Sequence, residues 1–352
     1  MIPRVTLLDL LGIEVPLVQA PMAGSNGSEL AVAVSSAGGL GSLPCALLAP
    51  DQIRSEVAAI RAGTDRPFNL NFFCHADVPP PESAGAVWFD RLSPYYAELE
   101  VDRPAALAPG RAPFDEQLCT IVEELRPPVV SFHFGLPAMP LMERVRRTGA
   151  RVLSSATTVA EARWLAEHGC DAVIAQGSEA GGHRGMFLGT DPAQQVGTMA
   201  LVPQMVDAVD VPVIAAGGIA DGRGVAAALA LGAEAVQVGT AFLRTPEALT
   251  SGPHRRALAD AADDATVLTN VMTGRPARGI ANRLVREVGP LSDDAPAFPY
   301  ATAGTAPLRA AAEAAGSSEF SPLWAGQAAA LAREESAAEV VRRLVSRRAG
   351  PA

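Results

Sequence analysis

The chain has 352 residues, of which 49% are hydrophobic and 19% are charged, and its formal net charge at pH 7 is −10. This composition describes a well-packed globular protein and is unlike that of a disordered or fibrous chain. The acidic balance, without a basic stripe, argues against a nucleic-acid partner.

Short apolar runs alternate with alanine-rich helical stretches along the first three quarters of the chain. We predict eight strands, at 16–19, 39–43, 68–72, 129–132, 151–154, 172–175, 212–215 and 235–238. We predict helices between them, at 28–37, 50–61, 114–125, 137–147, 157–167, 199–208 and 221–231, with one more after Pro246. Alternating strands and helices indicate parallel pairing through right-handed crossovers, and eight such units favour an α/β fold of the (β/α)8 TIM-barrel type.

Two segments break this rhythm. Residues 74–113 are rich in proline and aromatic residues, and we expect a long loop insertion over the barrel mouth. Residues 266–352 follow the eighth unit, and we expect a Pro/Ala/Gly stretch and then two helices. The predicted organisation is therefore a barrel over 1–265 and a C-terminal helical extension over 266–352 packed on it.

The cysteine and hydrophobicity patterns bear on location. The four cysteines show no CxxC spacing, which is typical of a reduced cytoplasmic protein. Residues 225–243 come closest to a membrane span, but Gly232 and Glu234 interrupt them, so we predict a helix followed by a strand instead. We expect no membrane segment and no signal peptide.

Polar residues, histidines and glycines follow the predicted strands. In a (β/α)8 barrel the chemistry lies at the C-terminal ends of the strands, so these residues should gather at one rim. The residues after the strands include APMAG (20–24), FCH (73–75), HFG (133–135), QGSEAGGHRG (176–185), AGGI (216–219) and GTAFL (239–243).

The glycines after the last two strands favour a phosphate site. Gly217, Gly218, Gly239 and Thr240 can present backbone N–H groups without side-chain obstruction. The alternative is that they only form tight turns. Since neither a Walker loop nor a GxGxxG opening is present, the phosphate would belong to FMN or a sugar phosphate.

His183 is the most prominent histidine, because Gly181 and Gly182 precede it and let a ligand approach the main chain. It could be a base, a metal ligand or a polar loop residue. Without HExxH or paired carboxylates we predict no metal site, and base or substrate contact is the sharper hypothesis. His75 and His133 also follow strands, whereas His168 ends a helix and His254 lies in a predicted polar loop.

Two amides at strand ends, Asn71 and Gln176, suit hydrogen bonds to a flavin ring edge or ribityl hydroxyls, or could equally satisfy loop backbone. Trp324 could be a core residue and Gln327 a capping residue, or both could reach the barrel mouth.

Nearly the whole chain resembles the nitronate monooxygenases, formerly called 2-nitropropane dioxygenases. The resemblance rests on the order and spacing of QAPMAG (19–24), AVSSAGGLG (33–41), NLNFF (69–73), SEAGGHRG (178–185), AAGGIADGRG (215–224), GTAFL (239–243), TGRPAR (273–278) and WAGQ (324–327).

The resemblance implies a barrel that binds FMN and uses O2 to oxidise nitronates or nitroalkanes to carbonyl compounds and nitrite through a flavin semiquinone. By motif, it implies His183 as the catalytic histidine and His133 in the substrate pocket. It places the remaining matched positions around FMN: Pro21, Met22, Ala23, Asn71, Gln176, Gly181, Gly218, Gly239, Thr240 and Gln327.

One region departs from the family pattern, because residues 298–309 offer Tyr300 and Arg309 but are otherwise small and apolar where tyrosines are common. An alternative function is an FMN-dependent NAD(P)H enoyl-thioester reductase, and another is a non-catalytic FMN- or phosphate-binding protein. The expected partners are a small-molecule nitronate or nitroalkane and O2, with a homodimer possible.

Overall fold

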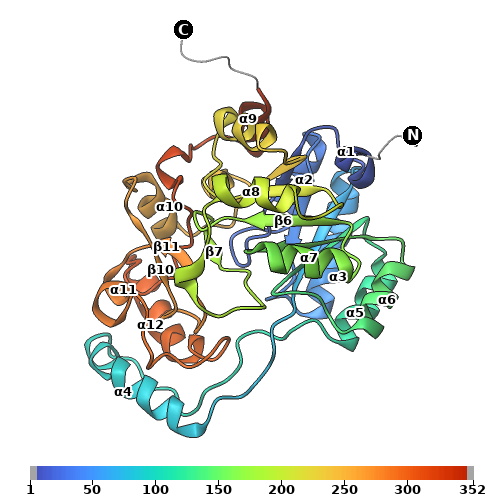
Figure 1. Cartoon of the computed structure of the whole chain (residues 1–352). Helices are drawn as coiled ribbons and strands as arrows, with labels where there is room; N and C mark the ends of the chain where they lie inside the picture. Colours follow the sequence, from blue (N-terminus) through green and yellow to red (C-terminus); the bar gives the residue numbers. More distant parts are fainter. Residues whose placement is uncertain (1–5, 347–352) are drawn as a thin grey trace.

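The computed structural model describes residues 6–346, so the outermost residues of the two predicted segments lie outside the described part. Its centre is an eight-stranded parallel barrel (Figure 1). The strands are β1 (Leu17–Gln19), β2 (Gly41–Pro44), β3 (Phe68–Phe73), β4 (Val129–His133), β5 (Arg151–Ala156), β6 (Ala172–Gln176), β8 (Val213–Ala216) and β9 (Ala235–Val238). The backbone of Leu40 closes the barrel by bonding to Leu17 and Gln19. The predicted (β/α)8 barrel is confirmed, and no strand end differs from its prediction by more than two residues.

Helices cover the outside of the barrel in the predicted order. They are α2 (Ser28–Ser36), α3 (Pro50–Gly63), α5 (Glu116–Leu125), α6 (Met139–Arg147), α7 (Val159–Glu167), α8 (Thr198–Val206), α9 (Gly222–Ala230) and α10 (Gly252–Ala259). The side chains of Thr158 and Asp221 cap α7 and α9 by accepting hydrogen bonds from backbone N–H groups of the first turn.

Alternation along the strands separates two apolar layers. Outward-facing residues such as Leu70, Val130 and Val173 pack under the helices, whereas inward-facing residues such as Leu153 and Ile214 fill the barrel. The short helix α1 (Leu7–Leu11) plugs the N-terminal end of the barrel with Leu7 and Leu11. With that end sealed by apolar side chains, only the carboxyl ends of the strands are left open to polar groups.

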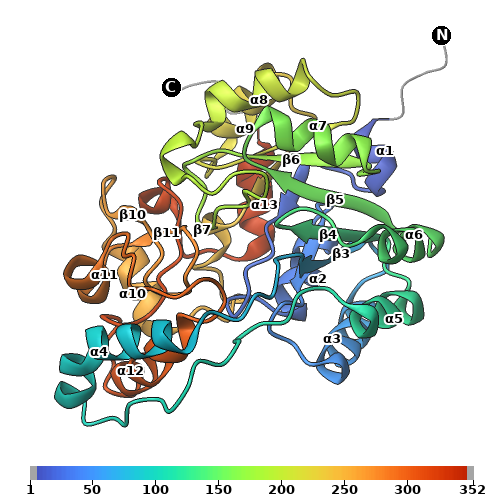
Figure 2. The same cartoon turned by 60° about the horizontal axis from the view of Figure 1, so that its bottom comes forward.

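The insertion is more ordered than the sequence indicates. The predicted long loop contains a 17-residue helix, α4 (Glu82–Glu98), which begins directly after the proline run. It lies beside α12 (Thr302–Ala314), away from the barrel, in both views (Figures 1 and 2). Trp88 and Leu92 join Leu308 in a second apolar core, and the Trp88 indole N–H donates to the Ala301 carbonyl at 3.0 Å.

The C-terminal segment also contains strands that the sequence analysis missed. Two of them, β10 (Thr266–Thr269) and β11 (Ala277–Ile280), form an antiparallel sheet with the two-residue strand β7 (Gly182–His183). Three α-helices follow instead of two, namely α11 (Arg283–Val288), α12 and α13 (Ala337–Val345). Helix α13 returns to the barrel and packs on α2 and α9.

The contact between β2 and α2 gives a stability prediction. A Cβ atom on Gly41 would lie 2.0 Å from the Ala31 carbonyl oxygen, so Gly41→Ala must push α2 away from the barrel. Overpacking of this kind costs about 1–3 kcal/mol of unfolding free energy. Gly189→Ala is a matched control, because nothing lies within 4 Å of its added Cβ. Urea unfolding should show a lower midpoint for Gly41→Ala alone, and equal midpoints would contradict the packing.

No helix within residues 6–346 is long and apolar enough to cross a membrane.

Candidate active site

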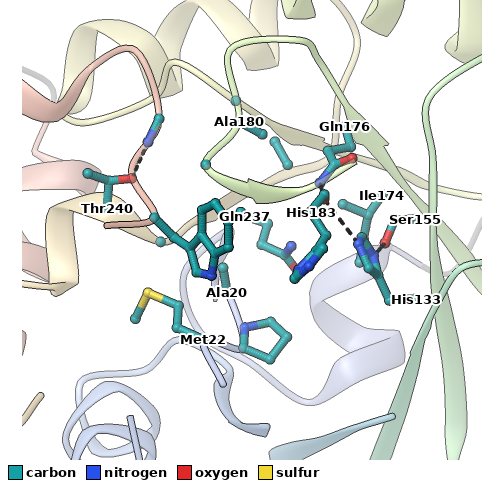
Figure 3. A pocket seen from close by; sticks show the side chains of 18 of the residues that line it. Ala20, Met22, His133, Ser155, Ile174, Gln176, Ala180, His183, Gln237 and Thr240 are labelled. Atoms are coloured by element: carbon teal, nitrogen blue, oxygen red, sulfur yellow. Dashed lines mark hydrogen bonds between the residues drawn. The ribbon is translucent and has the colours of Figure 1, made fainter. Parts of the chain in front are cut away.

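A cavity opens at the carboxyl ends of the barrel strands. Figure 3 shows His183 projecting into it, with Met22 on the facing side and Thr240 across from Gln176.

The uppermost inward-facing positions of the strands are polar, in contrast to the apolar layer beneath them. They include Asn71, His133 and Gln176, as expected at the rim. Three further residues were missed: Ser131, Ser155 and Gln237 also line the cavity. Counting every second residue down each strand from the rim could have found them, because inward-facing positions repeat with period two.

His183 is fixed by a strand pairing rather than carried on a free loop. In β7 it pairs with Ala277 of β11, and its Nε2 lies 2.9 Å from Thr273 Oγ1. The imidazole is buried, and its ring centre lies 5.2 Å from that of Phe298 and 5.5 Å from that of Trp324. Strand pairing and a hydrogen bond therefore hold one histidine at the cavity wall.

The Nε2–H tautomer of His183 satisfies the hydrogen bonds around Thr273. The Thr273 hydroxyl has an acceptor for its own hydrogen, the Arg275 carbonyl at 3.5 Å. In that tautomer Nε2 donates to Thr273 and Nδ1 keeps a lone pair.

The glycines around His183 lie where a side chain would strain the backbone or collide with a neighbouring residue. Gly182 has a φ of +74°, a left-handed conformation that L side chains rarely adopt. A Cβ on Gly185 would come within 2.8 Å of the His133 ring, and one on Gly181 would come within 2.5 Å of the Gly326 nitrogen. The glycines thus let this segment pass between His133 and the 324–327 segment.

His183 is neutral at physiological pH. Burial, with further contributions from Arg111, His133, Arg275 and His75, holds its pKa well below the usual value of 6.5. A neutral imidazole can accept a proton but supplies no positive charge to a substrate. This favours the base hypothesis for His183 over an electrostatic role.

Two side chains contact the main-chain carbonyl oxygen of His183. His133 Nε2 lies 3.2 Å from the His183 carbonyl oxygen, and Gln176 Nε2 donates to the same oxygen at 2.9 Å. Ser155 Oγ lies 2.6 Å from His133 Nδ1, and Gln176 Oε1 accepts from the Gly185 N–H. Burial lowers the pKa of His133 to about 3, so His133 is neutral as well. Both residues line the cavity, and their polar atoms position the 182–185 segment.

Arg184 anchors the same segment from behind. Its guanidinium is buried and donates to the carbonyls of Gly177 and Gln176 at 2.7 and 2.8 Å, and to Gln195 Oε1. These bonds tie the Arg184 guanidinium to the loop, and Arg184 does not line the cavity.

The glycines after β8 and β9 form a cradle of free donors. The backbone N–H groups of Gly218, Ile219, Gly239 and Thr240 donate to no acceptor among the described residues. All four residues line the cavity, and Thr240 Oγ1 accepts from the Gly326 N–H at 2.9 Å. Unpaired N–H groups in a cavity wall favour an anion, which fits the phosphate expected from the sequence.

The remaining predicted cofactor residues divide into two groups. Pro21, Met22, Ala23, Gly181, Gly182 and Gly217 line the cavity. Gln327 is exposed and does not line it, although its neighbours Gly326 and Ala328 do, and its backbone N–H donates to Glu179. Of the two residues left open in WAGQ, Trp324 is therefore the one that reaches the cavity.

The other histidines lie elsewhere. His75 is buried against Phe298 but does not line the cavity, and His168 ends α7, stacked on Trp164. His254 is buried within α10, so its prediction as a polar loop residue was wrong. Within residues 6–346 no group of three His, Cys, Asp or Glu side chains could hold a metal ion.

The chain is similar to nitronate monooxygenases over nearly its whole length. The family model described as nitronate monooxygenase matches residues 4–347. A nitronate monooxygenase of Pseudomonas aeruginosa is 44% identical over 339 residues, which cover 96% of this chain and 97% of that protein. One of Paraburkholderia phytofirmans is 42% identical and covers 96% and 93%.

Among solved structures, a nitroalkane oxidase from Streptomyces ansochromogenes superposes with a TM-score of 0.87 at 42% identity, covering 96% of each chain. FabK from Thermotoga maritima superposes less well, with a TM-score of 0.70 at 30% identity over 96% of this chain and 93% of FabK.

Proposed function

The chain belongs to the nitronate monooxygenase family, and from that premise we propose that it uses bound FMN and O2 to oxidise nitronates to carbonyl compounds and nitrite. The observation that carries the proposal is a neutral histidine fixed in the wall of a cavity that is also lined by four backbone N–H groups without an acceptor among the described residues. A flavin site needs a place for the cofactor phosphate, and oxidation of a neutral nitroalkane also needs a group that removes its α-proton.

The cavity fits FMN. The N–H groups of Gly218, Ile219, Gly239 and Thr240 would hold the phosphate, and Pro21, Met22 and Ala23 would lie against the isoalloxazine. Asn71 would face the ring or ribityl chain from the floor of the cavity. Bound FMN would supply the electron transfer from nitronate to O2.

His183 has a defined part in this reaction. With Nε2 donating to Thr273, Nδ1 would accept the α-proton of a neutral nitroalkane and so produce the nitronate in the site. A preformed nitronate has no such proton to lose and would bypass this step. His133 and Gln176 act as positioning residues, because they fix the His183 carbonyl and leave its ring free to face the cavity.

The product of an aerobic reaction tests the proposal. Cofactor released from the purified protein by heating should have the mass of FMN, at one molecule per chain. Protein incubated with ethyl nitronate in air should form nitrite and acetaldehyde in equal amounts, together with consumption of O2. A flavin-loaded protein that forms no nitrite would contradict the proposed function.

A further inference from the structure

We propose that Arg111 forms the anion-binding subsite of this cavity, where its guanidinium binds the negatively charged nitronate group of the substrate. The inference rests on the proposed function and adds the residue that selects anionic substrates. Arg111 comes from the 74–113 insertion and not from the barrel.

Arg111 is the one Arg, Lys, Asp or Glu side chain among the described residues that line the cavity. The other polar lining groups are amides, hydroxyls, backbone N–H groups and the two neutral histidines. An anionic substrate that enters this space therefore meets a single full positive charge.

The guanidinium of Arg111 has no counter-ion within residues 6–346. Its Nη1 is buried without a hydrogen-bond partner, and no carboxylate in the described part of the chain contributes to its charge environment. Burial lowers its pKa to about 10, with Arg309 adding repulsion, so it still carries its charge at neutral pH. A partly buried unpaired charge is costly unless an anion pairs with it, and no carboxylate in residues 6–346 fills that role.

Arg111 and His183 face the same part of the cavity. The Arg111 guanidinium carbon lies 6.0 Å from the ring centre of Phe73 and 5.6 Å from that of Phe298. The His183 ring lies 6.2 and 5.2 Å from the same two centres. After burial, the charge of Arg111 is the largest cause of the low pKa of His183. The two side chains therefore have separate roles: Arg111 binds the anion, and His183 accepts the proton.

The other nearby cations are already engaged. Arg309 donates to Glu313 Oε1 at 2.8 Å and does not line the cavity. Arg275 stacks on Phe134, with 3.9 Å from its guanidinium carbon to the ring centre, and it donates to the Met186 carbonyl. It does not line the cavity. This leaves Arg111 as the cation that a substrate anion can reach.

Nitrate is a suitable probe, because it is a planar monoanion with the shape and charge of a nitronate group. Titration calorimetry of the flavin-loaded protein should show nitrate binding that Arg111→Met weakens by about 10- to 100-fold, the usual effect of losing a hydrogen bond to a charged group. Arg111→Lys should retain an intermediate affinity. Arg103→Met is the matched control, since Arg103 lies in the same insertion, is paired with Asp90 and is absent from the cavity wall.

Kinetics should show the same selectivity. Arg111→Met should raise the KM for ethyl nitronate by a similar factor, while the KM for neutral nitroethane changes by less than about twofold. Because Arg111 has no ion pair to lose, this variant should unfold at a urea concentration no lower than the wild type. Wild-type protein that binds no nitrate, or an Arg111→Met variant that binds it equally well, would overturn the inference.

The two readouts separate this inference from the proposed function. Nitrate binding needs no turnover, so Arg111-dependent binding in a protein that oxidises no nitronate would support the subsite and reject the proposed reaction. Nitronate oxidation with nitrate binding independent of Arg111 would support the reaction and reject the subsite.

Discussion

Replacing His183 with asparagine is expected to lower kcat/KM for neutral nitroalkanes by about 10²- to 10⁴-fold, the usual contribution of a positioned general base. Asparagine keeps a polar group near Thr273 but cannot accept a proton at neutral pH. The expected loss on preformed nitronates is far smaller, because the α-proton has already gone. The measurement is steady-state turnover of nitroethane and of ethyl nitronate by the same two proteins.

Thr273→Val is the matched control for this prediction. It removes the hydrogen bond to Nε2 without removing the base, so its effect on nitroethane should be smaller than that of His183→Asn. Equal losses on nitroethane and ethyl nitronate for His183→Asn would reject the base assignment and leave His183 a binding role.

Acidification from pH 7 to pH 4 is expected to reduce the unfolding free energy by several kcal/mol. Burial is the main cause that lowers the pKa of His75 and His254 to about 4 and that of His133 to about 3. In the unfolded chain each would take up a proton near pH 6.5. Below that pH the unfolded state therefore binds more protons than the folded state, and stability falls as the pH drops towards 4. Each such histidine contributes up to about 1.4 kcal/mol per pH unit, and His183 acts in the same direction.

Urea unfolding at pH 7 and pH 5, with the same excess of FMN, measures this slope. His254→Gln provides a matched control, because His254 lies in α10 and outside the cavity. The number of protons that this variant takes up on unfolding should be smaller than that of the wild type by at most one, and its activity should be unchanged. A midpoint that does not change between pH 7 and pH 5 would contradict the low histidine pKa values.

The barrel was predictable because each of its strands is a short apolar run between helical segments. The same pattern also predicted the polar rim, because the carboxyl ends of parallel strands all lie at one end of the barrel. The structure brings His133, Gln176 and His183 together there, together with the glycines after β8 and β9.

The parts that were missed depend on contacts between distant segments. Helix α4 was hidden by the prolines that precede it and by Pro94 within it, and its apolar face is completed by α12, more than 200 residues later. Strand β7 has two residues and exists because β11 pairs with it, so no local periodicity could indicate it. Arg111 lacks any motif, and its place in the cavity follows from the return of the insertion to the barrel. Thr273 did lie in a quoted motif, but its bond to His183 spans 90 positions.

Anaerobic mixing of the purified, flavin-loaded protein with ethyl nitronate, followed by visible absorbance, tests the proposed function most directly. We predict that the nitronate reduces the flavin absorbance, that NADPH alone leaves it unchanged, and that air restores it with formation of nitrite. A flavin that ignores the nitronate and is bleached by NADPH would contradict the proposal and favour the enoyl-thioester reductase alternative.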